Sequence, residues 1–356
     1  MQLRSTPLLI TAVVSLGACS SATVTSTITV DQACAELATA RCSLRSNCSL
    51  PDGARGVGLG VRQLYGDMAT CLAREALACT TELSAAQTGN APGAVQLCVR
   101  AFMTYSCADF LDNVPPLDCT PAGPRPSGAA CAFDSQCQTG ACNGVGTALC
   151  GTCGDPPGLG EDCSASTCAR GARCLTAAQT CAPLGATTDA CDATHPCDRG
   201  LSCLVAGADS SGTCEIAGTR VGLGCGGKMR GCDATRGLFC VGAAGAGTCQ
   251  PVGLAGTAAD ADGGVTAANP DGGPMVPTPA GTPCGVLADG SRIACAAGTC
   301  VLQGETGVGA CVPFAADGYP CDSATGPACM PPARCVTDAD GTAGTCLVPS
   351  SADCPG

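Results

Sequence analysis

The chain has 356 residues, of which 35 are cysteine and only 2% are aromatic, with no tryptophan. So few large apolar side chains exclude one extensive hydrophobic core, because ordering each residue costs roughly 1–2 kcal/mol that buried apolar surface must offset. The net charge of −12 argues against nucleic acid and against anionic lipid as partners, since both require a basic surface. Disulfides, at typically about 2–4 kcal/mol each, are the expected substitute for a core.

The first 18 residues have the pattern of an export signal. Arg4 precedes an apolar stretch that ends near Leu16, and this stretch is shorter than the roughly 20 apolar residues that span a bilayer. The run Leu16-Gly17-Ala18-Cys19 is typical of a lipobox. We therefore expect cleavage before Cys19 and attachment of lipid, such as palmitate, to it. An ordinary secretory signal with a soluble product is the alternative.

Residues 19–30 are rich in serine and threonine and are expected to form a tether, although apolar alternation at Val24, Ile28 and Val30 would also suit a strand. By analogy with bacterial lipoproteins, which residues 16–19 resemble, Ser20 in place of aspartate after the cysteine implies the outer membrane of a bacterial cell envelope. Without Cys19, 34 cysteines remain, the even number that a fully disulfide-bonded exported protein needs.

Residues 31–119 contain eight cysteines and show helical periodicity. Three helices are predicted, over residues 31–45 with Asp31 as the N-cap, over residues 61–83, and over residues 90–111 with Pro92 in the first turn. Each carries cysteines on its apolar face. This pattern predicts a small helical bundle held by disulfides.

From Gly128 onward the cysteines recur in six units of about 30 residues. Each unit opens with a small residue three positions before its first cysteine: Gly128, Gly160, Thr188, Gly222, Gly281 and Gly318. Units one to four occupy residues 120–250, and units five and six occupy residues 281–356. Residues 251–280 lack cysteine and are rich in Ala, Gly, Asp and Pro, as expected of a flexible linker. Cys150 and Cys354 are surplus to four cysteines per unit.

Each unit is expected to be a short loop or β-hairpin module that depends on its disulfides. Four cysteines allow three connectivities, and sequence does not choose among them. We favour first-to-third with second-to-fourth pairing, because interleaved disulfides constrain both loops. The predicted pairs are Cys163–Cys174, Cys168–Cys181, Cys191–Cys203, Cys197–Cys214, Cys225–Cys240, Cys232–Cys249, Cys284–Cys300, Cys295–Cys311, Cys321–Cys335 and Cys329–Cys346.

The cysteine spacing, with a glycine before the third cysteine as in Cys197-Asp-Arg-Gly-Leu-Ser-Cys203, resembles the Dickkopf N-terminal cysteine-rich pattern. A helical cysteine module followed by such repeats resembles predicted bacterial lipoproteins of the myxobacterial type. The resemblance spans residues 31–356 and implies a framework rather than an activity. The Wnt co-receptor binding of animal Dickkopf proteins is not implied, because no receptor-contact residue is matched.

Catalytic and metal motifs receive little support. His195 is the single histidine, so any catalytic device based on histidine would need it, and its place in a five-residue loop between cysteines favours an ordinary loop residue. Cys150-Gly-Thr-Cys153 has the spacing of a zinc or redox pair, but export favours disulfides. The stretches 260–263 and 338–341 resemble calcium-loop fragments without the later acidic ligand. We therefore predict no enzyme, no metal and no cofactor.

The leading hypothesis is a non-enzymatic, envelope-anchored surface lipoprotein with a binding or structural role, whose partners are the membrane, through the lipid on Cys19, and an unknown protein. Short loops held between disulfides suit recognition, because they lose little entropy on binding. The alternative is a protease inhibitor, with loops 155–162 and 323–328 as candidates.

Overall fold

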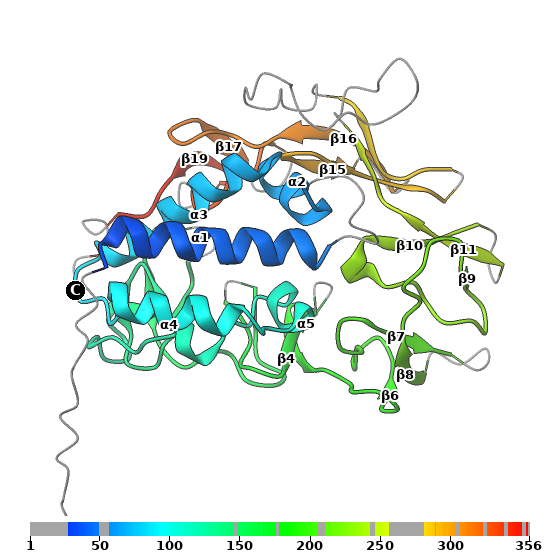
Figure 1. Cartoon of the computed structure of the whole chain (residues 1–356), viewed down its shortest axis with the longest axis horizontal. Coiled ribbons are helices and arrows are strands. Elements are labelled where there is room, and N and C mark those ends of the chain that lie inside the picture. The colour runs from blue at the N-terminus through cyan, green and yellow to red at the C-terminus, as the bar shows by residue number, and fades with distance from the viewer. Residues whose placement is uncertain are drawn as a thin grey trace, which may run out of the picture.

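The computed structural model describes residues 28–49, 57–145, 148–164, 166–175, 178–205, 211–242, 246–255, 281–288, 290–302, 307–322, 326–337, 341–350 and 354. The predicted signal peptide, Cys19 and most of the predicted tether and linker lie outside the described residues. Within this part, an N-terminal helical region precedes small antiparallel hairpins, and disulfides run throughout (Figure 1). The predicted disulfide-rich class, helical first and then hairpins, is confirmed.

The first helix, α1 (Val30–Asn47), is capped by Thr29. The Thr29 hydroxyl accepts the backbone N–H of Gln32, and the Gln32 side chain accepts the N–H of Thr29, a reciprocal capping box. Asp31, the predicted cap, lies instead in the first turn, where its charge favours the positive end of the helix dipole.

The predicted helix over residues 61–83 is two helices, α2 (Leu59–Tyr65) and α3 (Met68–Leu83). Gly66 ends α2 with a φ of 82°, a conformation that costs glycine little. Asp67 then starts α3, because its carboxylate accepts the backbone N–H of Thr70 at 2.7 Å.

The predicted helix over residues 90–111 is also divided, into α4 (Pro92–Phe102) and α5 (Cys107–Leu111). Ser106 caps α5 by accepting the N–H of Asp109 at 3.0 Å. A short 3-10 helix, η1 (Leu117–Cys119), ends the helical region.

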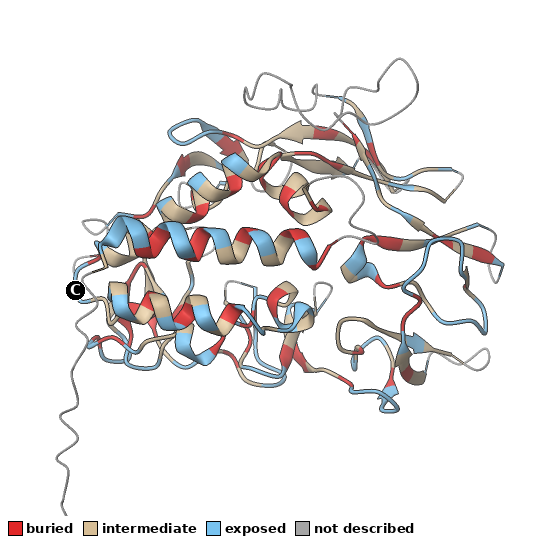
Figure 2. Ribbon diagram, viewed as in Figure 1, coloured by how far each residue is buried: buried red, intermediate tan, exposed pale blue. Residues whose placement is uncertain are grey.

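Four disulfides fasten these helices. Two of them, Cys34–Cys79 and Cys42–Cys71, join α1 to α3. Cys48–Cys107 joins the end of α1 to α5, and Cys98–Cys119 joins α4 to η1. The buried residues concentrate where the helices face one another (Figure 2), and a small core of Leu37, Val95, Phe102 and Phe110 lies beside these disulfides.

The strands are short, with none longer than six residues in the described part of the chain. Their bounds are β1 (Ala130–Cys131), β2 (Cys142–Asn143), β3 (Gly151–Cys153), β4 (Ala172–Leu175), β5 (Thr180–Pro183), β6 (Ala190–Cys191), β7 (Leu201–Leu204), β8 (Gly212–Ile216), β9 (Gly224–Cys225), β10 (Leu238–Val241), β11 (Gly247–Pro251), β12 (Gly253–Ala255), β13 (Pro283–Val286), β14 (Arg292–Cys295), β15 (Gly298–Leu302), β16 (Val308–Pro313), β17 (Pro320–Asp322), β18 (Arg334–Thr337) and β19 (Ala343–Leu347). The 3-10 helices η2 (Asp134–Gln136) and η3 (Ala234–Arg236) complete the elements. Residues 253–255, which were predicted to be linker, form β12.

The six units share one sheet plan. In four of them the strand of the fourth cysteine lies between those of the first and third, as in β6-β8-β7. The second unit has two strands, and the fifth is extended to five by β12 and β14. In every unit the third and fourth cysteines are direct cross-strand partners, as Cys203 and Cys214 are.

Each unit is closed by the same pair of backbone hydrogen bonds. The opening residue donates its N–H to the carbonyl of the fourth cysteine, over 2.8 Å for Gly128 and Cys153 and 2.7 Å for Gly318 and Cys346. The fourth cysteine returns its N–H to the residue after the opening one. All six opening residues have positive φ, between 76° and 92°, which explains why five of them are glycine.

The units surround the helices rather than trailing from them. In Figure 1, β4 lies below α5, units three and four (β6–β11) lie beyond the ends of the helices, and β15–β19 lie above α2 and α3. Among the described residues, no helix combines the length and apolar character required to cross a membrane.

Candidate functional site

The disulfides of the six units follow one interleaved pattern. In each unit the first cysteine is bonded to the third and the second to the fourth. Unit one contributes Cys131–Cys142 and Cys137–Cys153. The ten remaining bonds join the same cysteines as the ten pairs given above.

The two surplus cysteines form the disulfide Cys150–Cys354, over a sequence separation of 204 residues. This bond ties the first unit to the residue after the last unit, so the chain between them becomes a covalent ring. With it, each of the 34 cysteines in the described part of the chain is in a disulfide. None of them is a free thiolate.

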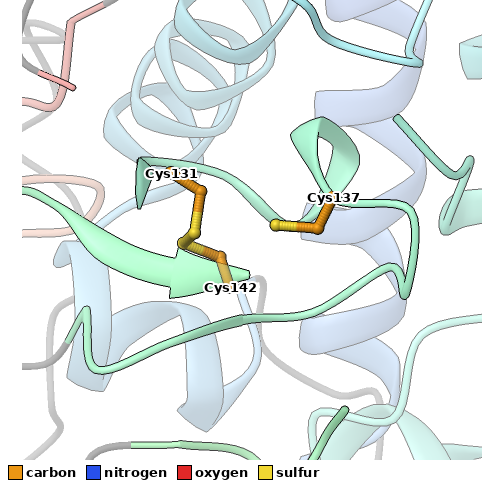
Figure 3. A group of neighbouring side chains, drawn as sticks. All are labelled: Cys131, Cys137 and Cys142. Carbon is orange, nitrogen blue, oxygen red and sulfur yellow. A yellow bond between two sulfur atoms is a disulfide. The ribbon is translucent and has the colours of Figure 1, made fainter. Parts of the chain in front are cut away.

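The sulfur clusters of the units therefore do not have the chemistry of metal sites. Sulfur atoms of Cys131, Cys137 and Cys142 lie within 4.8 Å of one another (Figure 3). Two of them are bonded to each other, and the third is bonded to Cys153. Since a metal needs the thiolate form, these sulfurs support the fold and not an ion.

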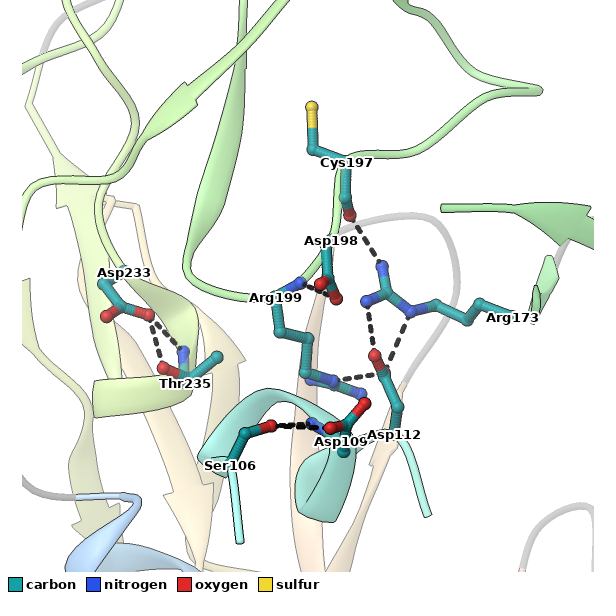
Figure 4. Close-up of polar contacts among 9 residues, drawn as sticks. All are labelled: Ser106, Asp109, Asp112, Arg173, Cys197, Asp198, Arg199, Asp233 and Thr235. Atoms are coloured by element: carbon teal, nitrogen blue, oxygen red, sulfur yellow. Dashed lines mark hydrogen bonds and ion pairs between the residues drawn. The ribbon is translucent and has the colours of Figure 1, made fainter. Parts of the chain in front are cut away.

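A buried carboxylate anchors two of the units to the helical region. Asp112 follows α5, and its side chain is only 3% exposed. Arg173 of unit two donates Nε to Asp112 Oδ1 at 2.9 Å and Nη2 to Oδ2 at 2.8 Å, while Arg199 of unit three also donates Nε to Oδ1 (Figure 4). A third Arg173 bond, from Nη1 to the carbonyl of Cys197 at 3.1 Å, links unit two directly to unit three. The Asp112 side chain thus fixes the positions of both units relative to α5.

Arginines fasten the last unit in the same way. Arg74 of α3 forms a bidentate pair with Asp317, at 2.6 and 2.8 Å, and donates to the carbonyl of Pro331. Arg334 donates to the carbonyls of Leu149 and Ala132 of unit one, both at 2.9 Å. Units six and one are therefore neighbours in space, beside the disulfide that joins them.

A charged cluster lies inside the helical region. Glu75 is 5% exposed and accepts a hydrogen bond from the Tyr65 hydroxyl at 2.8 Å. Arg41 Nη1 is 3.2 Å from one of its oxygens and Arg45 Nη2 is 3.9 Å from the other. Burial, followed by the Glu75 charge, raises the pKa of Tyr65, so its hydroxyl keeps its proton.

Two hollows adjoin this cluster, and Arg41, Arg45 and Asn113 line both. The smaller, of about 390 Å³, lies between α3 and Pro331. The larger, of about 850 Å³, lies between the helices and the first two units. Its volume is within the roughly 300–1,000 Å³ that is typical of small-molecule pockets.

Two acids border the larger hollow. Glu82 accepts a hydrogen bond from Asn90 at 3.2 Å, and Asp134 accepts the N–H of Cys142 at 2.8 Å. Burial away from water raises the pKa of both carboxyls. The hydrogen bonds that each carboxylate accepts lower its pKa and so offset part of this effect.

The catalytic candidates of the sequence do not come together. His195 is 59% exposed in its loop, with Nδ1 2.9 Å from the Thr194 hydroxyl and 3.3 Å from Asp192. Hydrogen bonds from Thr194 and from His195 lower the pKa of Asp192 to about 2. Asp192, Thr194 and His195 hydrogen-bond to one another, so they form a local turn. In loop 155–162, Gly158 donates its N–H to Glu161 at 2.7 Å, whereas residues 260–263, 323–325 and 338–340 lie outside the described residues.

Sequence reasoning missed the arginines that connect units and helices. One signal was present, because Lys228 is the single lysine among 17 basic residues. Arginine is the residue that suits bidentate and partly buried ion pairs.

The sequence matches no protein-family model, no curated protein and no solved structure.

Proposed function

We propose that this protein is an exported, non-enzymatic lipoprotein of the bacterial cell envelope, held to the outer membrane through Cys19, which binds a protein partner or has a structural role there. One observation carries the proposal: each of the 34 cysteines in the described residues is disulfide-bonded. Such complete pairing is typical of oxidising compartments outside the cytoplasm.

The proposed organisation is a tether, a disulfide-stapled helical bundle over residues 31–119, and six Dickkopf-like units. The shared closing hydrogen bonds and the interleaved disulfides support treating the six units as copies of one module. Because the units are covalently restrained, their exposed loops would lose little entropy when a partner binds.

The lipid anchor is tested by fractionating cells that express the wild type or Cys19→Ala. We expect the wild type in the membrane fraction, with a mass increase from acylation, and the variant outside that fraction. A wild-type protein of unmodified mass would overturn the anchor.

Complete disulfide pairing is tested separately by intact mass before and after reduction with alkylation, which should count 34 cysteines in disulfides.

The binding role is tested by crosslinking on intact cells, with the oxidised and the reduced protein compared. A partner that crosslinks only to the oxidised protein supports recognition by the restrained loops. Equal crosslinking after reduction would contradict it.

A further inference from the structure

The arginine pair of α1 has more N–H donors than the described residues around it use. Arg41 and Arg45 share the single carboxylate of Glu75, and Tyr65 in the same cluster is uncharged. Each guanidinium has five N–H donors, yet among the described residues the one ion-pair partner of each is Glu75. The Nε atoms of both arginines are buried and have no hydrogen-bond partner in the described part of the chain. The larger hollow also contains three carboxylates, Glu82, Asp118 and Asp134, opposite Arg41, Arg45, Arg170 and Arg334, so the unused donors, and not a charge excess, point to an anion.

The charged pair adjoins an apolar wall. The Arg45 guanidinium carbon lies 5.1 Å from the centroid of the Phe110 ring. Phe110 in turn packs edge-on against Phe102, with centroids 6.0 Å apart. Both rings and Val95 line the larger hollow together with the two arginines. Charged and apolar recognition elements thus meet in one space, as in many small-molecule sites.

The pair is reachable from solvent. The Arg41 side chain is 37% exposed, whereas that of Arg45 is 15% exposed. An anion could therefore approach Arg41 from water and contact Arg45 in a drier setting, where charge-assisted hydrogen bonds are stronger.

We propose that the larger hollow binds a small organic anion, a carboxylate or phosphate monoester with an apolar group, with its charged head at Arg41 and Arg45 and its apolar group against Phe110 and Phe102. This site goes beyond the proposed envelope function and depends neither on Cys19 nor on a protein partner. Failure of either proposal therefore leaves the other standing.

The test measures binding of phenylacetate and phenyl phosphate to the oxidised full chain, with neutral phenylacetamide as the matched probe. Arginine Nε–H signals in a nitrogen-15 spectrum report the site. We expect both anions to shift the Arg41 and Arg45 signals, and phenylacetamide to bind at least about tenfold more weakly. The tighter of the two anions identifies the preferred head group.

Arg45→Gln and Arg41→Gln should each weaken binding of the anions roughly tenfold, while Arg100→Gln on the exposed side of α4 should leave it unchanged. Free-thiol counts and circular dichroism check that each variant is folded, and the more exposed Arg41 provides a second variant should Arg45→Gln misfold. Equal affinity for phenylacetamide, unchanged affinity in both variants, or no binding of either anion would overturn the site.

Discussion

At the scale of single residues, the opening residue of each unit has to meet two structural requirements. It must adopt positive φ while its N–H closes the unit on the fourth cysteine. Thr188 does this with a φ of 76°, although a β-branched residue is strongly disfavoured there. Its N–H still reaches the Cys214 carbonyl at 2.8 Å, so unit three closes in the same way as the units that open with glycine.

Thr188→Gly should therefore stabilise the protein by about 1 kcal/mol, because strain in this region costs about 1–3 kcal/mol and the added freedom of glycine when unfolded offsets part of the gain. The measurement is denaturant unfolding with disulfides intact. The converse change, Gly160→Ala at the same position of unit two, should destabilise by a similar amount, since its φ is 79°. A destabilised Thr188→Gly would show that the threonine side chain supports the turn.

Glu82 makes stability depend on pH. Because its pKa is raised in the folded state, the fold favours the protonated form. This contribution is present below the ordinary glutamate pKa of about 4.3 and is lost as pH rises through the higher folded value. Glu82→Gln should thus unfold at higher denaturant than the wild type at pH 7, and the difference should vanish near pH 4. Asp118→Asn, on the exposed η1, is the control; an equal offset at both pH values would contradict the assignment.

At the scale of elements, the residue before the third cysteine contacts another unit in units two, three, four and six. Arg173 donates to unit three, and Ser202 accepts the N–H of Gly231 in unit four at 3.0 Å. Phe239 lies under Arg292 of unit five, 4.4 Å from ring centroid to guanidinium carbon. Arg334 of unit six then donates to unit one. The same position that joins successive units also joins the last to the first.

Asp112→Asn should release units two and three from α5. One carboxylate serves Arg173 and Arg199, and its loss leaves both guanidinium groups without their charged partner. Both arginines are partly exposed, so we expect a loss of about 2 kcal/mol rather than the roughly 3–5 kcal/mol of a fully buried pair. Amide hydrogen exchange should rise in residues 166–205 while all disulfides persist. Unchanged exchange there would show that the disulfides alone hold these units.

The covalent ring is a property of the whole molecule. The helices lie within the ring of units, which is closed by Cys150–Cys354 and, at the same point, by Arg125, which donates to the Cys354 carbonyl at 3.1 Å. The closing bond acts on a chain already held by contacts to the helices, so its contribution should be near the lower end of the usual range of about 2–4 kcal/mol.

Removing that bond with Cys150→Ser and Cys354→Ser should lower stability by about 2 kcal/mol. Faster proteolysis should appear in units one and six, whereas units three and four should be unaffected. Small-angle scattering should show an enlarged radius of gyration. A variant as compact and protected as the wild type would mean that the arginine contacts alone close the ring.

Composition and local spacing determined much of this protein. Scarce aromatic residues and abundant cysteine predicted a disulfide-rich fold, and helical periodicity separated the N-terminal region from the hairpins. The positions of Gly66 and Ser106 divide two predicted helices, because turn and cap chemistry ended each periodic stretch earlier than the apolar spacing did. These are local properties, set by neighbours within a few residues.

Only the tertiary structure decided how the units are arranged. The Cys150–Cys354 bond, the convergence of Arg173 and Arg199 on Asp112, and the hollow beside Arg41 and Arg45 join residues that lie far apart in the chain. Cysteine spacing restricts which loops can form within a unit, but it carries no information about which unit meets which helix. That choice depends on charge pairing and packing between surfaces that exist only after the units have folded.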